Sequence, residues 1–414
     1  MLKQLIKNSY NTFFYLIILS LSNIQGQDYQ ILLKSEFKPS EQGYWWLDKN
    51  NSGIKNSNFH LSSMLELNTL KTQYVLTLIT SDKKELDFKE SFIKHNFSDE
   101  TFLRLGKYYR DFSTYLNDDL SSGSMLISHN ASPMNKIGLV TSKQWRNLDF
   151  NFGMSHGVFD DNNSFYTKDP LLHEKFIYMN RSINNYDISV GLVHEAMWGG
   201  GLPDQLGGNQ TQNFKNFVKV FFSSDGEKLE GQSHANALGN HLGIWEFFIK
   251  KTDNDRITKF YYQHIFEDTS SLRFANRIDG LWGTELINYL PNTTILFEYL
   301  DTTNCCIDPP YQNDRYYWNG QYGGGWSYNN YTLGNPFISH LEHELIRVFH
   351  VGLHSNIGQN YYQIKASRKI NLTDNIKYKI LIGRSMKQNF DIEIMVINNE
   401  KNQHKIGLVL SKFL

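Results

Sequence analysis

Few residues of this sequence could carry out chemistry, and none belongs to a complete motif. The segment HLEHE at 340–344 offers histidine and glutamate side chains, which are metal-ligand types. Its spacing does not match the HExxH zinc motif, and no third ligand is obvious. In a strand, His340 and Glu342 would share one face, whereas His343 and Glu344 would point to opposite faces. The sequence therefore predicts no metal site.

Other titratable residues follow strand patterns. His350 and His354 alternate with apolar residues, which would place both on the polar face of a strand, the lumen face if the strands form a barrel. Histidines there are expected to be hydrogen-bonded wall residues rather than catalysts. Asp391 and Glu393 would lie about 6–7 Å apart on one strand face, which is conceivable for a glycosidase pair. Such pairs are common on polar walls, and the sequence has no GxSxG motif and no P-loop. We therefore predict that the protein is not an enzyme and has no cofactor.

The most unusual stretch is rich in aromatic residues and glycine, from 311 to 331 (YQNDRYYWNGQYGGGWSYNNY). Aromatic faces beside Asn and Asp suit carbohydrate binding, because a ring can stack on sugar C–H groups while polar groups bind hydroxyls. The glycines at 323–325 would let an extended polymer approach closely. We predict a polysaccharide-binding site formed by Tyr316, Trp318, Tyr322, Trp326 and Tyr328. The stretch also fits an interfacial aromatic belt or a packed plug.

Composition excludes several protein classes. The chain has 414 residues, with 41 basic and 42 acidic side chains and a formal net charge of -1. This balance argues against a nucleic-acid partner, which needs a clustered basic face. The two cysteines, Cys305 and Cys306, are adjacent, so they cannot link distant segments or form a four-cysteine zinc site.

The N-terminal segment differs from the rest of the chain. Lys3 and Lys7 precede a short apolar stretch at 13–21, and Gly26 is a small residue before Gln27. The apolar stretch is too short to span about 30 Å of hydrocarbon. We predict that residues 1–26 are a secretory signal peptide and residues 27–414 the mature protein. A buried N-terminal helix is the alternative.

Apolar and polar residues alternate with a period of two through the rest of the chain, most clearly in 146–156, 186–193 and 389–396. Successive side chains of a strand point to opposite faces, so each segment has one apolar and one mostly polar face. We predict that the apolar faces contact lipid through Phe150, Phe152, Ile188, Val190, Ile392 and Ile394.

Soluble β-sandwiches alternate in the same way, but together with the predicted export signal the pattern favours an all-β fold, a transmembrane antiparallel β-barrel. No later segment has about 18 consecutive apolar residues, so a membrane location would require a closed barrel. We count roughly 16 to 20 strands by alternation. Short turns are interspersed with long breaks near 111–134, 157–173, 196–213, 223–237 and 301–333, as in outer-membrane barrels. We expect short helical or plug segments, one of them near 111–134.

Several stretches, taken in order, resemble the Wzi-type outer-membrane capsule-assembly family. They are GKYYR (106–110), LSSGSMLISHNASPMNKIGL (120–139), LLHEKFIYMNRS (171–182), WGGGLPDQLGG (198–208), GNHLGIWEFFIK (239–250), DGLWGTELI (279–287), FEYLDTT (297–303) and YGGGWSYNNYTLGNPFI (322–338). The resemblance implies an outer-membrane barrel of about 18 strands with some helix at the periplasmic side or in the lumen. It also implies a lectin-like role in holding and organising capsular or exopolysaccharide at the cell surface.

The expected partners are therefore this polysaccharide and outer-membrane lipid, without nucleic acid. Two other functions stay open at this point. One is an open porin or diffusion channel, and the other is a barrel enzyme acting on lipid or glycan. The aromatic cluster and the Ser-Gly-Ser element at 122–124 favour the binding role, because they suggest stacking surfaces and segments that fill the lumen.

Overall fold

The computed structural model describes residues 28–37, 59–82, 84–161, 163–226, 237–267, 272–305, 315–372, 374–398 and 404–413. The predicted signal peptide, the first residues of the aromatic cluster at 311–314 and Cys306 lie outside the described residues. No helix in the described part of the chain is long and apolar enough to cross a membrane.

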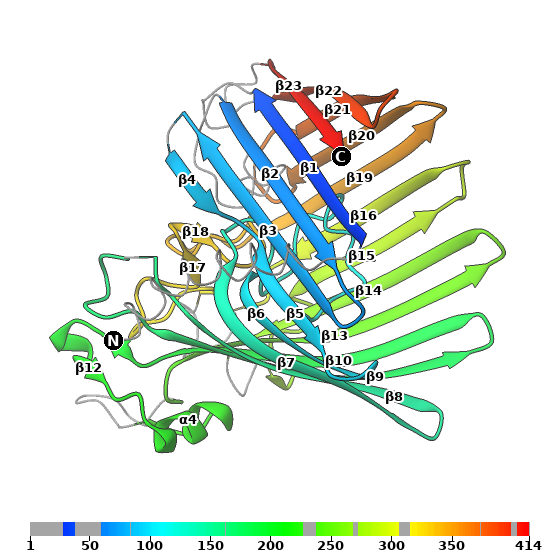
Figure 1. The fold of residues 1–414 in the computed structure, drawn as a ribbon. Coiled ribbons are helices and arrows are strands. Elements are labelled where there is room, and N and C mark those ends of the chain that lie inside the picture. Colours follow the sequence, from blue (N-terminus) through cyan, green and yellow to red (C-terminus); the bar gives the residue numbers. More distant parts are fainter. Residues whose placement is uncertain are drawn as a thin grey trace.

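The described residues form one large antiparallel sheet (Figure 1). Its strands are β1 (Asp28–Phe37), β2 (Phe59–Asn68), β3 (Thr72–Ser81), β4 (Lys84–Phe88), β5 (Ser91–Asn96), β6 (Thr101–Tyr108), β7 (Met134–Trp145), β8 (Leu148–Val158), β9 (Leu171–Ile183), β10 (Tyr186–Trp198), β13 (Asn240–Asp253), β14 (Arg256–Phe266), β15 (Gly280–Ile287), β16 (Thr293–Asp301), β19 (Arg347–Ile357), β20 (Asn360–Lys369), β21 (Lys377–Met386), β22 (Phe390–Asn398) and β23 (His404–Phe413).

The sheet closes on itself as an 18-stranded barrel. It contains 19 strands, but β4 and β5 pair with successive parts of β3 and so occupy one strand position. The last strand, β23, pairs with β1 from Leu32↔Phe413 to Phe37↔Leu408 and so closes the ring of strands, whereas β4 is paired with β3 alone among the described strands. The predicted fold class and strand number are confirmed.

Turns are short at one end of the barrel and long at the other. Two-residue turns join β7 to β8, β9 to β10 and β13 to β14. Asn184 and Asn254 adopt positive φ in these turns, a conformation that fits tight hairpins and that asparagine tolerates. Long loops span 109–133, 159–170, 199–239 and 302–346. In outer-membrane barrels the short turns are periplasmic and the long loops extracellular, so the long-loop end is the cell-surface end.

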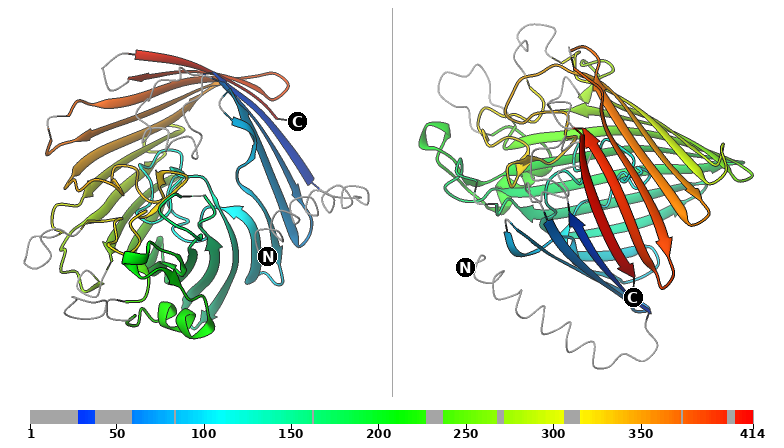
Figure 2. Two further views of the ribbon diagram at one scale, coloured as in Figure 1. Left: turned by 90° about the vertical axis from the view of Figure 1, so that its left-hand side faces the viewer. Right: turned by 90° about the horizontal axis from the view of Figure 1, so that it is seen from above.

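Short elements lie in two of the long loops. The loop between β10 and β13 holds the hairpin β11 (Gly200–Gly201)–β12 (Asn209–Gln210), the 3-10 helix η1 (Asp204–Leu206) and α4 (Phe214–Phe221). The loop between β16 and β19 holds the hairpin β17 (Ser327–Tyr328)–β18 (Tyr331–Thr332). Parts of these loops lie within the ring of strands, together with the loop between β6 and β7 (Figure 2).

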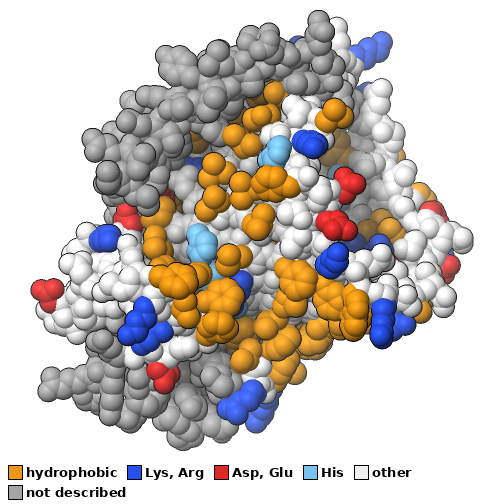
Figure 3. All heavy atoms as spheres, turned by 60° about the horizontal axis from the view of Figure 1, so that its bottom comes forward, with side chains coloured by type: hydrophobic (Ala, Val, Ile, Leu, Met, Phe, Trp, Pro, Cys, Tyr) orange, Lys and Arg blue, Asp and Glu red, His pale blue; other side chains and the backbone are white. Residues whose placement is uncertain are grey.

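The two faces of each strand differ as the alternation predicts. The Tyr178 hydroxyl on β9 contacts the loop inside the barrel, and Asn151 on β8 pairs with Tyr178, so Asn151 shares this lumenal face. Phe150 and Phe152 therefore point outward. The same argument from β13 and β20 places the remaining predicted lipid contacts outward: Ile188, Val190, Ile392 and Ile394. Figure 3 shows hydrophobic side chains gathered over the face at the bottom of Figure 1, where β7–β10 lie.

Replacing Phe152 with Arg should destabilise the barrel by about 2–4 kcal/mol, because the charge would face hydrocarbon. The matched Asn151→Arg variant places the same side chain on the lumenal face and should cost much less. Urea unfolding and refolding of both variants in lipid vesicles measures the difference. Equal losses for the two variants would contradict the assignment of faces.

Candidate functional site

The loop 109–133, called here the inner plug, crosses the lumen and is hydrogen-bonded to the wall. The Ser113 backbone N–H donates to the Tyr178 hydroxyl on β9, at 3.1 Å. The hydroxyls of Ser113 and Tyr115 both donate to Glu246 on β13, the latter at 2.6 Å. The inner plug is thus tied to the wall near its first residues.

The next residues of the inner plug contact two further strands. Asn117 donates its amide to Glu285 on β15, at 2.7 Å. The Ser121 hydroxyl and the Ser122 N–H donate to Glu298 on β16, at 2.6 and 2.7 Å. We call Glu246, Glu285 and Glu298 the acidic ladder. All three are buried, and these donors compensate for the cost of removing carboxylates from water.

Neutral wall residues complete the attachment. The Met125 N–H donates to the Gln263 side chain on β14, at 2.9 Å. His350 on β19 bridges the Leu120 carbonyl and the Ser367 hydroxyl, each at 2.7 Å. His350 is therefore a hydrogen-bonded wall residue, as the sequence predicted.

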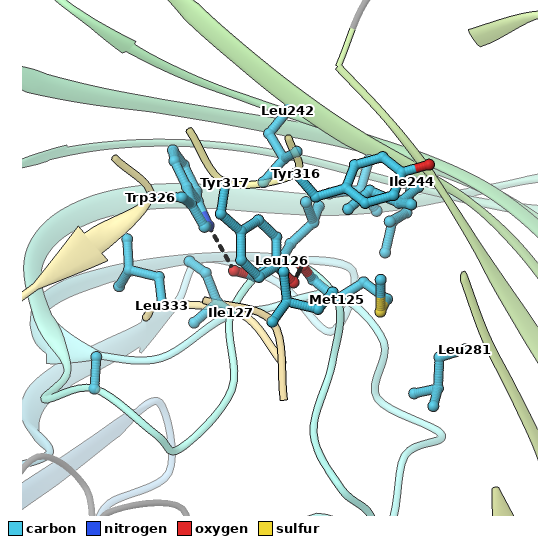
Figure 4. Close-up of a cluster of buried hydrophobic side chains, with 14 of the residues drawn as sticks. Met125, Leu126, Ile127, Leu242, Ile244, Leu281, Tyr316, Tyr317, Trp326 and Leu333 are labelled. Carbon is cyan, nitrogen blue, oxygen red and sulfur yellow. Dashed lines mark hydrogen bonds between the residues drawn. The ribbon is translucent and has the colours of Figure 1, made fainter. Parts of the chain in front are cut away.

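Residues 315–346, called here the outer plug, pack against the inner plug (Figure 4). The Trp326 indole N–H donates to the Leu126 carbonyl at 2.8 Å, and the Tyr317 hydroxyl donates to the Met125 carbonyl at 2.5 Å. The Asn335 amide donates to the Gly123 carbonyl at 2.8 Å. Two loops that are about 200 residues apart in sequence thus form one hydrogen-bonded core.

The predicted site residues divide into two groups. Four of them are buried in the outer plug, with exposed fractions of 0–7%: Tyr316, Tyr322, Trp326 and Tyr328. They match the packed-plug alternative that the sequence left open. Trp318 differs, because 36% of its surface is exposed.

The glycines at 323–325 allow loops to pack closely. A Cβ on Gly323 would lie 2.6 Å from the Phe165 ring, and one on Gly324 would lie 2.7 Å from the Tyr166 hydroxyl oxygen. Gly325 has a φ of +67°, which glycine adopts without strain. The expectation that these glycines leave room for a polymer is wrong at 323 and 324, because aromatic side chains of the 159–170 loop occupy that space.

Trp318 is linked through Arg315 to a small pocket in the outer plug. The Arg315 guanidinium lies over its ring, 4.3 Å from the centroid, and donates to the Leu341 carbonyl at 3.3 Å. Arg315 also lines the pocket together with Ser339, Glu342 and His343. We call Arg315, Trp318, Ser339, Glu342 and His343 the Trp318 rim. It combines one aromatic face with cationic, anionic, imidazole and hydroxyl groups.

The HLEHE segment is divided between different surroundings. His340 is buried, and its ring nitrogen lies 2.9 Å from the Thr332 hydroxyl. Glu344 pairs with Lys369 and, with Glu342 and His343, lines the pocket. In the described part of the chain no cluster of three or more His, Cys, Asp or Glu side chains could hold a metal ion. Nothing in the residue types or spacing of this segment predicted that Glu342 and His343 line the pocket.

Asp279 supports the base of the pocket. Its carboxylate accepts hydrogen bonds from the Asn304 N–H, the Cys305 N–H and the Tyr316 hydroxyl, at 2.9, 2.6 and 2.8 Å. Burial raises the pKa of Asp279 to about 6, although these donors oppose the shift. Cys305 is buried and disulfide-bonded. The predicted carboxylate pair lies elsewhere, on β22, where Glu393 accepts a hydrogen bond from Tyr361.

Comparisons with known proteins agree with this architecture. A family model described as capsule assembly protein Wzi matches residues 26–369. No curated protein matches the sequence. The fold is similar to that of Wzi from Escherichia coli, described as an outer-membrane carbohydrate-binding β-barrel involved in group 1 capsule assembly, with a TM-score of 0.59, 12% identity, and coverage of 94% of this chain and 84% of that chain. The outer-membrane protein OpdK of Pseudomonas aeruginosa matches with a TM-score of 0.49 and 8% identity, covering 94% and 98% of the two chains.

Removing the ladder carboxylates should release the inner plug. In the Glu246→Ala/Glu298→Ala variant, buried donors of Ser113, Ser121 and Ser122 lose their acceptors, at a cost of about 1–3 kcal/mol each. We expect higher single-channel conductance in planar bilayers than for the unsubstituted protein. The control is Glu393→Ala, because Glu393 accepts a hydrogen bond from Tyr361 of the wall and not from the inner plug. A large open conductance already present without substitution would contradict a hydrogen-bonded plug.

Proposed function

Because this chain belongs to the capsule assembly protein Wzi family, with a match over residues 26–369, we propose that it binds and organises capsular or exopolysaccharide at the cell surface. It is an outer-membrane β-barrel with 18 strand positions. The observation that carries the proposal is the Trp318 rim, which combines an exposed aromatic face and polar groups at the cell-surface end of a plugged barrel.

The plugs favour binding over transport. Barrels of this strand number leave a water-filled lumen unless loops fill it. Here the inner plug contacts wall residues on β9, β13, β14, β15, β16 and β19. The outer plug is hydrogen-bonded to the inner plug and packs against it. This arrangement supports a fixed binding platform better than an open porin.

The Trp318 rim suits a sugar chain chemically. The indole ring can stack on sugar C–H groups, and Ser339, Glu342 and His343 can bind hydroxyls. Arg315 adds a planar cation that matches a carboxylate, such as that of an acidic sugar. The buried rings of Tyr316, Tyr322, Trp326 and Tyr328 would then support the site from beneath. We propose a binding role without catalysis.

We also propose that residues 1–26 are an export signal, so the mature chain should begin near Gln27. N-terminal sequencing of protein purified from the outer-membrane fraction reads this directly. Boiled and unboiled samples should also migrate differently on a denaturing gel, because a closed barrel resists detergent unfolding. Recovery of the protein in the cytosol with Met1 intact would contradict export.

Replacing Trp318 with Ala should weaken polysaccharide binding several-fold. A stacking contact is worth about 1–3 kcal/mol on nucleic-acid bases, and a sugar should be near the lower limit. The Arg315→Ala/Trp318→Ala variant should lose more, and cells producing it should release polysaccharide into the medium. Isothermal titration with purified polysaccharide from the same cells and a surface-retention assay measure the two effects.

Trp145→Ala is the matched control, because Trp145 is an exposed tryptophan at the short-turn end of the barrel. Trp326→Ala tests the supporting role, and we expect it to disturb the outer plug because it removes a buried ring and its hydrogen bond to Leu126. If the Arg315/Trp318 double variant folds normally and retains polysaccharide as well as the unsubstituted protein, the Trp318 rim is not the site.

A further inference from the structure

The lipid-facing wall carries an unexpected polar patch near its cell-surface end. It consists of His156 on β8, His173 and Lys175 on β9, His194 on β10 and His241 on β13. On β9 these side chains alternate with the lumenal Glu174, and they share their face with the exposed Ile177. Polar groups of this kind are costly beside hydrocarbon. Something must therefore cover them.

The helix α4 covers the patch. The Phe217 ring lies 5.3 Å from the His156 ring and 5.4 Å from the His173 ring, measured between centroids. Val220 is fully buried against Ala196 and Trp198 on β10. These contacts place α4 on the outside of the barrel rather than in the lumen.

Hydrogen bonds at the helix C-terminus complete the cover. The Lys175 ammonium donates to the Phe221 carbonyl and lies 4.1 Å from the Phe221 ring centroid. A cation is favourable at this end of a helix, where carbonyl groups lack partners. The Ser223 hydroxyl oxygen lies 3.1 Å from His194 Nε2. The Asn213 side chain caps the other end by accepting from the Asn216 N–H.

The outer side of α4 is strongly apolar. Phe214 and Val218, four residues apart, share one side of the helix, and Phe222 follows directly as its C-cap residue. They are exposed by 78%, 37% and 69%. Lys215 is exposed on the adjoining side, so apolar and cationic sides are next to each other. This is the pattern of a helix that lies in a membrane interface.

We propose that α4 is an interfacial helix that inserts Phe214, Val218 and Phe222 into the outer leaflet, with Lys215 at the level of the anionic headgroups. The position of α4 supports lipid as the occupant. The helix covers the wall where the apolar band of β8 and β9, with Met154 and Ile177 exposed, gives way to the histidines. Its apolar side therefore continues a surface that already contacts lipid.

The helix also connects the membrane to the outer plug. The loop that carries α4 begins at Gly199, whose carbonyl accepts a hydrogen bond from the Tyr322 hydroxyl at 3.2 Å. The Gln321 amide donates to the Leu206 carbonyl of the same loop, also at 3.2 Å. Insertion of α4 would hold this loop, and with it the outer plug, at a fixed height above the bilayer. The lipid contact itself does not depend on the proposed polysaccharide function.

Depth-dependent quenching tests the proposal in the full-length protein. Phe214→Cys and Phe222→Cys variants are labelled with a nitrobenzoxadiazole thiol reagent and reconstituted into phosphatidylcholine–phosphatidylglycerol vesicles. The described residues contain no free cysteine, so the label should report the introduced position. Lipids brominated near the headgroup end of the acyl chain should quench both labels several-fold more than a label in the matched Lys215→Cys variant. Heat-modified gel migration confirms that each variant is folded.

Equal quenching at all three positions, or no quenching at 214 and 222, would overturn the proposal. Light scattering of the protein in nanodiscs measures the number of copies per particle, and so tests whether a second copy of the chain covers this face instead of lipid. If labels at 214 and 222 are shielded from brominated lipid and two copies share a particle, this face is a contact between copies of the chain. Polysaccharide binding measured on the same samples keeps this result separate from the proposed function.

Discussion

The interior of this barrel depends on pairing the buried wall carboxylates Glu246, Glu285 and Glu298 with donors from the inner plug. A barrel with 18 strand positions has a lumen too wide for wall side chains to fill. Carboxylates buried in such a space need hydrogen-bond donors, and the hydroxyls and N–H groups of 113–122 supply them. The inner plug is thereby fixed to the wall. The outer plug takes its position from the inner plug, since Trp326 and Asn335 donate to carbonyls at 126 and 123.

The sequence predicted the wall well because the wall follows a local rule. A period of two assigns each side chain to a face, so Phe152 and Ile394 could be placed toward lipid without any knowledge of their neighbours. Strand number and closure were predicted from repetition of this pattern and from the family resemblance. The long breaks were also predictable, since a tight hairpin needs only two residues, such as those beginning at Asn184. The pairing of β23 with β1 could be inferred only from the requirement that a membrane-spanning sheet must close on itself.

The surroundings of the candidate site residues were predicted less completely because their contacts are distant in sequence. Trp326 looks like a surface aromatic in its own segment, and only the Leu126 carbonyl, 200 residues away, shows it to be part of a core. Trp318, eight residues earlier, has nothing local to distinguish it, yet it remains exposed. The HLEHE segment was assessed from the sequence for metal binding only, and its division between His340 in the core and His343 at the pocket depends on how the outer plug folds. Aromatic composition thus singled out the segment that contains Trp318, but not which of its rings stays accessible.

The polar patch on the outer face also could not be explained from local sequence alone. Strand alternation places His173 and Lys175 toward lipid, which would be unfavourable if the strand were considered alone. The structure resolves the conflict with α4, whose Phe217 and Val220 cover the patch and whose terminal carbonyl at Phe221 accepts from Lys175. The loop carrying α4 is in turn bonded to the outer plug. The outer plug, which carries the Trp318 rim, is therefore connected both to the acidic ladder, through the inner plug, and to the loop of α4 on the outer wall.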